Sequence, residues 1–127
     1  PYAVFIGRAT RREAPAALLS WGNSTGEVSV LLASVLRTPD RARGHGVANR
    51  IGTSNPAVDA LITRAEREMD DASRATLLRE ATALALDDAM LVPLYLQSAV
   101  WAMRAGLAYE PRMDERNDPL AVTGSSR

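Results

Sequence analysis

Three stretches with apolar residues at helical spacing do most to restrict the fold of this chain. Apolar residues three and four positions apart form one face of a helix, and that face must be buried. The stretches cover residues 28–36, 58–69 and 77–85. Their apolar residues are Val28, Leu31, Leu32, Val35 and Leu36; Val58, Leu61, Ile62, Ala65 and Met69; and Leu77, Leu78, Ala81, Leu84 and Ala85. The pattern predicts three amphipathic helices.

The residues that flank these stretches favour helix ends at definite places. Asn55 can cap the second helix, and Pro56 suits its first position, where no backbone donor is needed. Asp71 or Ser73 can cap the third helix. Residues 37–55, between the first two helices, form a long connection with several glycines and arginines. A loop of this length inside a compact domain is often functional.

Short runs rich in β-branched, aromatic and other apolar residues predict strands around the helices. The runs cover residues 2–6, 16–21, 91–96, 100–103 and 107–109. The run 91–96 is continuously apolar, which is typical of a strand buried on both faces, and Pro93 places it at an edge or near its own start. Helices and strands in this order predict an α/β fold with a mixed sheet and about three helices.

The composition removes several classes of function. With 127 residues, 46% hydrophobic and 24% charged, the chain can form one globular domain or a piece of a larger one. Fifteen basic residues balance fifteen acidic ones, so no net field attracts nucleic acid. Without cysteine, disulfides, thiolate metal sites and cysteine nucleophiles are impossible. We expect no cofactor and no metal, because His45 is the only histidine.

The turn Gly22-Asn23-Ser24-Thr25-Gly26 matches the G-x-S-x-G pattern of a serine hydrolase nucleophile elbow. It follows an expected strand and precedes an expected helix, as such an elbow requires. In that fold the acid precedes a histidine that comes late in the chain. Here Asp40 and His45 are five residues apart, and no histidine follows them. A serine hydrolase is therefore the alternative function, and a simple turn leading into a helix explains the pattern better.

The same turn offers hydrogen-bonding groups to a small polar ligand. Trp21 stands directly before it and can supply an aromatic wall, while Ser24 and Thr25 supply hydroxyls beside the backbone donors of a helix N-terminus. In an open α/β sheet, ligands bind outside the carboxyl ends of the strands. The turn is therefore a candidate binding site, with burial in the core as the alternative role of Trp21.

Five segments of the chain occur in the order and spacing of a known family. The segments are WGNSTGE at 21–27, SNPAVDAL at 54–61 after Asn49, VPLY at 92–95, WAMRAGL at 101–107 and YEPRMDE at 109–115. In this order they resemble the C-terminal quarter of the extracytoplasmic solute-binding proteins of ABC importers, family 5, the peptide/nickel type. The resemblance runs over nearly all of the chain and rests on the series of segments.

The resemblance implies the two-lobed periplasmic-binding-protein (type II) fold of a longer protein. Residues 1–110 would form part of its C-terminal lobe, and residues 111–127 would cross toward the other lobe and end in a loose tail. Such proteins capture a peptide or a related small polar solute between their lobes, without catalysis, and deliver it to the ABC permease subunits. The implied location is periplasmic or extracytoplasmic. A lobe cut from its partner should be less stable than a complete one, or should associate with another copy.

The resemblance also places the turn on the cleft side. The ligand-binding residues expected on this basis are Trp21, Gly22, Asn23, Ser24, Thr25, Asn49 and Arg50. In the peptide binders an aspartate three residues after the matching tryptophan holds the peptide's amino group. That position is Ser24 here, which replaces a charge-assisted hydrogen bond with a neutral one about half as strong.

A third hypothesis for the function of the chain is a structural or interaction module that binds no ligand.

Overall fold

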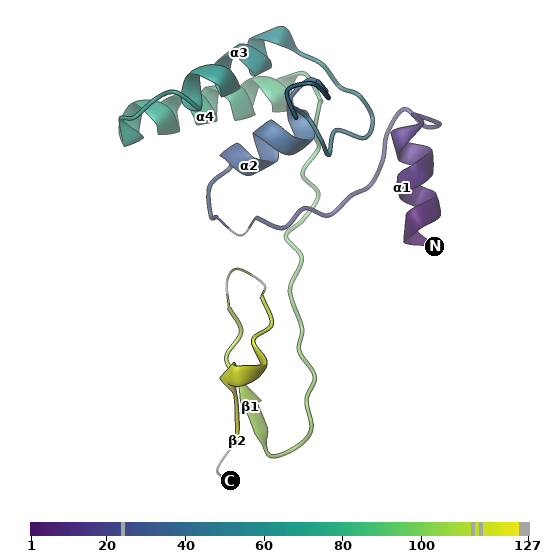
Figure 1. Ribbon diagram of the computed structural model, residues 1–127, viewed down its shortest axis with the longest axis vertical. Helices are drawn as coiled ribbons and strands as arrows, with labels where there is room; N and C mark the ends of the chain where they lie inside the picture. Colours follow the sequence, from purple (N-terminus) through teal and green to yellow (C-terminus); the bar gives the residue numbers. More distant parts are fainter. Residues whose placement is uncertain (24, 113, 115, 125–127) are drawn as a thin grey trace.

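The computed structural model describes residues 1–23, 25–112, 114 and 116–124. Its elements are α1 (Tyr2–Thr10), α2 (Ser29–Leu31), the π-helical turn η1 (Leu32–Leu36), α3 (Pro56–Ala65), α4 (Asp71–Asp87), β1 (Leu107–Tyr109), the 3-10 turn η2 (Pro119–Ala121) and β2 (Val122–Gly124). Figure 1 shows α2, α3 and α4 together at one end, α1 beside them and the strands at the other end. We call residues 27–90 the helical region, residues 91–103 the arm and residues 104–124 the hairpin.

The hydrophobic core lies in the helical region, where α3 and α4 pack side by side and α2 with η1 packs against them (Figure 1). Its buried side chains are Leu32, Leu36, Val58, Ile62, Ala65, Leu77, Leu78, Ala81, Ala85 and Met90. Leu61 and Leu84 pack against this core, so the predicted apolar faces are confirmed. Met69 was assigned to the second face wrongly. It is 91% exposed, because α3 ends at Ala65.

Side-chain caps determine where α3 and α4 begin. The Asn55 side chain accepts hydrogen bonds from two N–H groups of the first turn, at 2.9 and 3.3 Å, and Pro56 occupies the first position, as predicted. The prediction for α4 is wrong by one residue or more. Asp70, rather than Asp71 or Ser73, is the cap, and its carboxylate accepts the Ser73 N–H at 2.8 Å. Asp70 has the extended backbone that a cap requires.

Backbone hydrogen bonds hold the long connection between η1 and α3 against the end of the first helix. The Gly46 N–H donates to the Ala33 carbonyl oxygen at 3.2 Å, and the Ala48 N–H donates to that of Ser34 at 2.8 Å. Gly46 has a φ of 59°, and a Cβ atom there would collide with the Arg37 carbonyl oxygen. Glycine therefore allows the loop to pass this close to η1.

Residues 2–6 are helical, which corrects the predicted strand. After α1 the Glu13 carboxylate binds the Arg8 and Arg11 guanidinium groups at 2.7 Å each. A strand needs a neighbour for its hydrogen bonds, whereas a helix satisfies its own backbone. No strand lies beside this segment in the part of the chain that the structure describes, so the helix forms despite a β-rich composition. Residues 16–21 are irregular, which corrects the second predicted strand.

The predicted strands at 91–96 and 100–103 are also not formed, and the first is mostly exposed rather than buried. The last predicted strand, 107–109, is confirmed as β1. It pairs antiparallel with β2 in the register Leu107–Gly124, Ala108–Thr123 and Tyr109–Val122. The arm has no partner strand within the described residues, and an extended chain without one cannot form a sheet.

At the coarse level the fold is mixed α/β, with helices and a two-stranded antiparallel sheet. The hairpin pairs residues on both sides of position 110, the expected end of the lobe segment, and residues 125–127 of the expected tail lie outside the described residues. None of the described helices combines the length and the apolar character needed to span a bilayer.

Candidate functional site

The turn before α2 is shaped by its own side chains. The Asn23 Oδ1 atom accepts hydrogen bonds from the N–H and the hydroxyl of Thr25, at 3.2 and 2.9 Å. The Asn23 Nδ2 atom donates to the Glu27 carbonyl oxygen at 2.6 Å. An asparagine that binds backbone two residues further on is typical of a tight turn. Both predicted side chains therefore lie together, and they stabilise the turn that carries them.

The other predicted residues of the turn differ in what the structure describes. Trp21 is 43% exposed and follows an irregular segment, which corrects its expected place at the end of a strand. Gly22 is exposed beside it. Ser24 lies outside the described residues, so both its expected ligand contact and its alternative role as a nucleophile remain predictions. The indole of Trp21 is therefore accessible at the entrance to the turn.

Glu27 joins the turn to α4 through a two-pronged ion pair. The Arg74 Nε and Nη2 atoms donate to its two carboxylate oxygens at 2.8 and 2.9 Å, and the Ser29 hydroxyl donates at 2.6 Å. These hydrogen bonds, from Arg74 first and Ser29 second, lower the pKa of Glu27 to about 2. Arg74 also donates to the Ala65 carbonyl oxygen at 2.7 Å. The carboxylate nearest to the turn is therefore charged and already paired.

A groove of about 740 Å³ lies between this ion pair and the outer face of α4. Its lining combines apolar and charged side chains: Val28, Leu78 and Leu86 with Glu27, Asp71, Arg74 and Arg79. Gly26 brings the end of the predicted turn to the groove, which places the turn and the groove side by side. Apolar walls with a few polar groups are the usual composition of a small-molecule site. The groove is the part of the site that the sequence analysis missed.

Asn49 and Arg50 lie in the long connection rather than in the turn. Asn49 is buried, and its Nδ2 atom donates to the Arg37 and Thr53 carbonyl oxygens at 3.0 and 2.8 Å. Its Oδ1 atom accepts the N–H groups of Gly52 and Thr53 at 2.8 and 3.1 Å. These bonds use all the hydrogen-bonding capacity of a side-chain amide. Asn49 therefore organises the loop, and Arg50 is half-buried next to it.

Asp40 and His45 face each other across an isolated β-bridge in the same loop. Their backbones exchange hydrogen bonds of 3.1 and 2.9 Å. The Asp40 carboxylate accepts hydrogen bonds from the N–H groups of Ala42 and Arg43 at 3.0 and 3.2 Å, so it stabilises the backbone turn that it begins. Among the described residues, no three His, Asp or Glu side chains gather closely enough to hold a metal ion.

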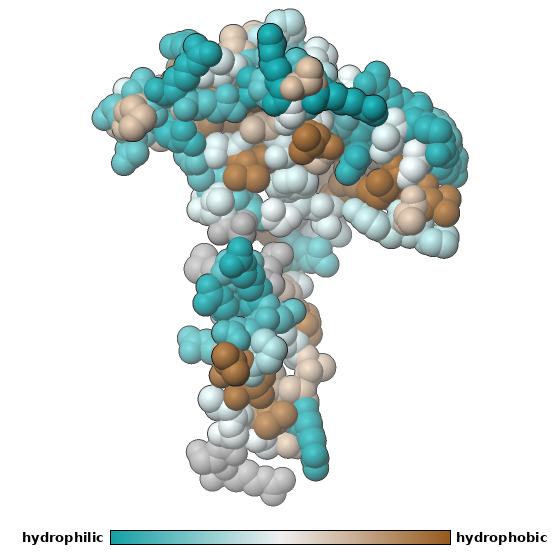
Figure 2. Space-filling view, viewed as in Figure 1, coloured by the Kyte–Doolittle hydropathy of each residue, from teal (hydrophilic) through white to brown (hydrophobic). Residues whose placement is uncertain are grey.

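The arm presents apolar side chains over its whole length. The exposed fractions are 66% for Val92, 64% for Leu94, 77% for Tyr95, 98% for Leu96 and 87% for Val100. Figure 2 shows brown apolar surface along the narrow lower part of the molecule, apart from the helical region. A contiguous exposed apolar surface is typical of an interaction site.

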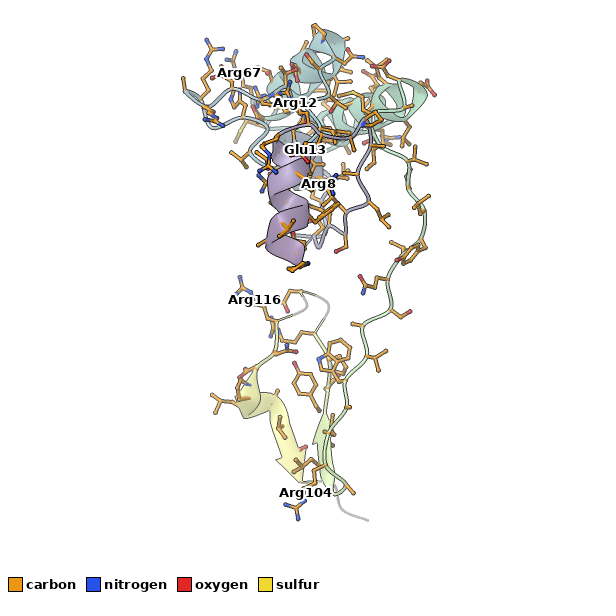
Figure 3. All side chains as sticks on the ribbon, turned by 90° about the vertical axis from the view of Figure 1, so that its right-hand side faces the viewer. Arg8, Arg12, Glu13, Arg67, Arg104 and Arg116 are labelled. Atoms are coloured by element: carbon orange, nitrogen blue, oxygen red, sulfur yellow. The ribbon has the colours of Figure 1, made fainter. Side chains whose placement is uncertain are left out.

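Trp101 is the residue that anchors the arm to the hairpin. Its ring lies 6.2 Å from the Tyr109 ring, and its Nε1 atom donates to the Asn117 side-chain oxygen at 2.8 Å. Arg104 and Arg116 lie at opposite ends of the hairpin (Figure 3). The two arginines therefore lie on either side of this aromatic contact.

No family model, no curated protein and no solved structure matches this chain.

Proposed function

We propose that this chain is part of the ligand-binding lobe of an extracytoplasmic solute-binding protein that serves an ABC importer. The ligand is a peptide or a related small polar solute, captured without catalysis. The observation that carries the proposal is the groove beside α4, which Gly26 at the end of the turn borders. The family resemblance assigns this same turn to the cleft side of the binding protein.

The chemistry of the groove supports a neutral or backbone-type ligand. Val28, Leu78 and Leu86 offer apolar contact to a ligand in the groove. Glu27 is neutralised by Arg74, so it does not compete for a ligand's ammonium group. Recognition through peptide N–H and C=O groups then fits better than recognition of a free amino terminus.

The finer features of this proposal concern the rest of the protein. Residues 1–110 belong to the C-terminal lobe of a type II periplasmic-binding-protein fold, and residues 111–127 cross toward the other lobe. The permease subunits of the importer are the partners, and the protein works in the periplasm or on the extracytoplasmic face.

Calorimetric titration of the chain with trialanine, and with trialanine acetylated and amidated at its ends, tests the proposal. We expect both peptides to bind with similar affinity, because the Glu27 carboxylate beside the turn is already paired with Arg74. Trp21→Ala should weaken binding about fivefold or more, the effect of losing an aromatic anchor. Trp101→Phe, in the hairpin, is the matched control and should bind as the parent chain does. No heat of binding with either peptide, or unchanged affinity in Trp21→Ala, contradicts the proposal.

A further inference from the structure

The arm has a free backbone as well as exposed side chains. Between residues 91 and 103 the described structure contains no backbone–backbone hydrogen bond, and Figure 1 shows this segment as a long extended trace. Backbone N–H and C=O groups in an extended apolar segment are a template for pairing with another strand. The arm therefore lacks the hydrogen-bonding partner that its sequence favours.

The sequence of the arm is compatible with pairing to itself. No charged residue occurs from position 91 to position 103, so two arms can lie together without opposing like charges. Pro93, which has no N–H group, lies outside the segment 94–102 and does not interrupt its donors. In an extended chain successive side chains alternate between two faces. Leu94, Leu96 and Val100 therefore share the face opposite to Trp101, which packs on the hairpin.

We propose that two copies of this chain associate by antiparallel pairing of residues 94–102, with Ser98 opposite Ser98 of the second copy. This register places Leu96 opposite Val100 and Leu94 opposite Ala102 on the exposed face. On the other face it places Tyr95 opposite Trp101. Aromatic pairs and aliphatic β-branched pairs are the cross-strand contacts that stabilise a sheet most.

A second copy of the chain fits the arm because the apolar surface of one arm is complementary to the same surface of another. A two-fold axis brings the same surface of both copies together, so each large side chain meets one from the other arm. The six large side chains Val92, Leu94, Tyr95, Leu96, Val100 and Met103 are 43–98% exposed. Four of them, Leu94, Tyr95, Leu96 and Val100, lie in the paired segment, so association removes apolar surface of both copies from water. The pairing is independent of the proposed ligand, since it uses no residue of the groove.

Single cysteines test the register directly, because the chain has none of its own. Residues directly opposite in an antiparallel pair have Cα atoms ~4.5–5.5 Å apart, within the range of a disulfide. Ser98→Cys should therefore form a disulfide-linked dimer under mild oxidation, seen on a non-reducing gel. Leu94→Cys should not, because its copies lie eight residues apart in this register, roughly 27 Å.

Met69→Cys measures chance collision, since Met69 is 91% exposed on the helical region. Ser98→Cys must cross-link well above this level. Equal cross-linking by Leu94→Cys would indicate parallel pairing and overturn the register, and cross-linking of Ser98→Cys no faster than Met69→Cys would overturn the pairing itself.

Light scattering after size exclusion tests the assembly without any cross-link. The parent chain should have the mass of a dimer at micromolar concentration. Leu96→Arg should be a monomer, because in both copies it replaces the apolar partner of Val100 with a charge that would lose its water. Met69→Arg is the matched control and should remain a dimer. A monomeric parent chain, or a dimeric Leu96→Arg, overturns the proposal.

Discussion

The helical region and the arm use the same kinds of side chain in opposite ways. Leu32, in η1, is completely buried, whereas Leu96, in the arm, is 98% exposed. The helices satisfy their own backbone groups, so their apolar faces are free to come together. The extended arm would have to find hydrogen bonds and apolar contacts in the same partner. Composition alone therefore does not decide burial, because the type of backbone decides what each side chain can reach.

The largest expected effect comes from truncating the matched leucines. Leu32→Ala should lower the free energy of unfolding by about 2–5 kcal/mol, because it opens a cavity in the core. Leu96→Ala should change it by less than about 0.5 kcal/mol, since it removes an exposed side chain. Urea denaturation followed by circular dichroism at low protein concentration measures both. Similar losses in the two variants would show that the regions do not differ in packing.

A smaller effect is expected from replacing one asparagine of the long connection and one of the hairpin, each of which makes side-chain hydrogen bonds. Asn49→Ala should cost about 1–3 kcal/mol, because it leaves buried backbone groups of the long connection without partners. Asn117→Ala removes only the partner of the exposed Trp101 N–H, which water can replace. Thermal unfolding by circular dichroism compares them. An Asn49→Ala variant as stable as Asn117→Ala would contradict the structural role assigned to the loop.

The smallest expected effect is the loss of stability at low pH that comes from protonation of Glu27. The pKa of Glu27 is lowered by Arg74 from 4.5 to about 2, so the unfolded chain takes up this proton first as the pH falls. The stability that the ion pair contributes is therefore complete above about pH 4.5 and is lost by about pH 2. Glu27→Gln should flatten the fall in melting temperature across this window.

Asp114 provides the comparison from the hairpin. Its hydrogen bond from Arg112 lowers the pKa of Asp114 to about 2 as well. None of the described hairpin residues belongs to the hydrophobic core, so Asp114→Asn should leave the acid dependence of the main transition as it is. A flattening in Asp114→Asn equal to that in Glu27→Gln would show that the two regions unfold together.

The helices could be predicted because their signals are local. The spacing of the apolar residues gave the faces of α3 and α4, and Asn55 with Pro56 gave the start of α3. The cap of α4 was displaced because two neighbouring aspartates carry the same signal. Only the backbone conformation distinguishes Asp70 from Asp71.

Four of the five predicted strands are absent from the described structure, because a strand depends on a neighbour that local sequence does not reveal. Residues 2–6 and 91–96 have similar β-rich compositions, yet one is a helix and the other is extended and unpaired within the described residues. Residues 107–109 became a strand because β2 lies opposite.

The candidate site likewise has one part that depends on local sequence and one part that depends on a long-range contact. The turn at Asn23 and Thr25 was found from its residues, since an Asx turn is local. The groove depends on the contact between Glu27 and Arg74, which are 47 residues apart. No periodic pattern joins them, so that contact emerges only from the packing of α4.

The wide turn at η1 makes one part of this chain tolerant of changes in length. Its closing hydrogen bond, from the Arg37 N–H to the Leu32 carbonyl oxygen at 2.8 Å, spans one residue more than an α-helical turn. Deleting one residue within η1 would restore regular α-helix and keep both flanking leucines on the core side. Deleting one in the first half of α4 would rotate Ala81 and Ala85 about 100° away from the core. Natural insertions and deletions should therefore be accepted at the end of the first core helix and rejected in α4.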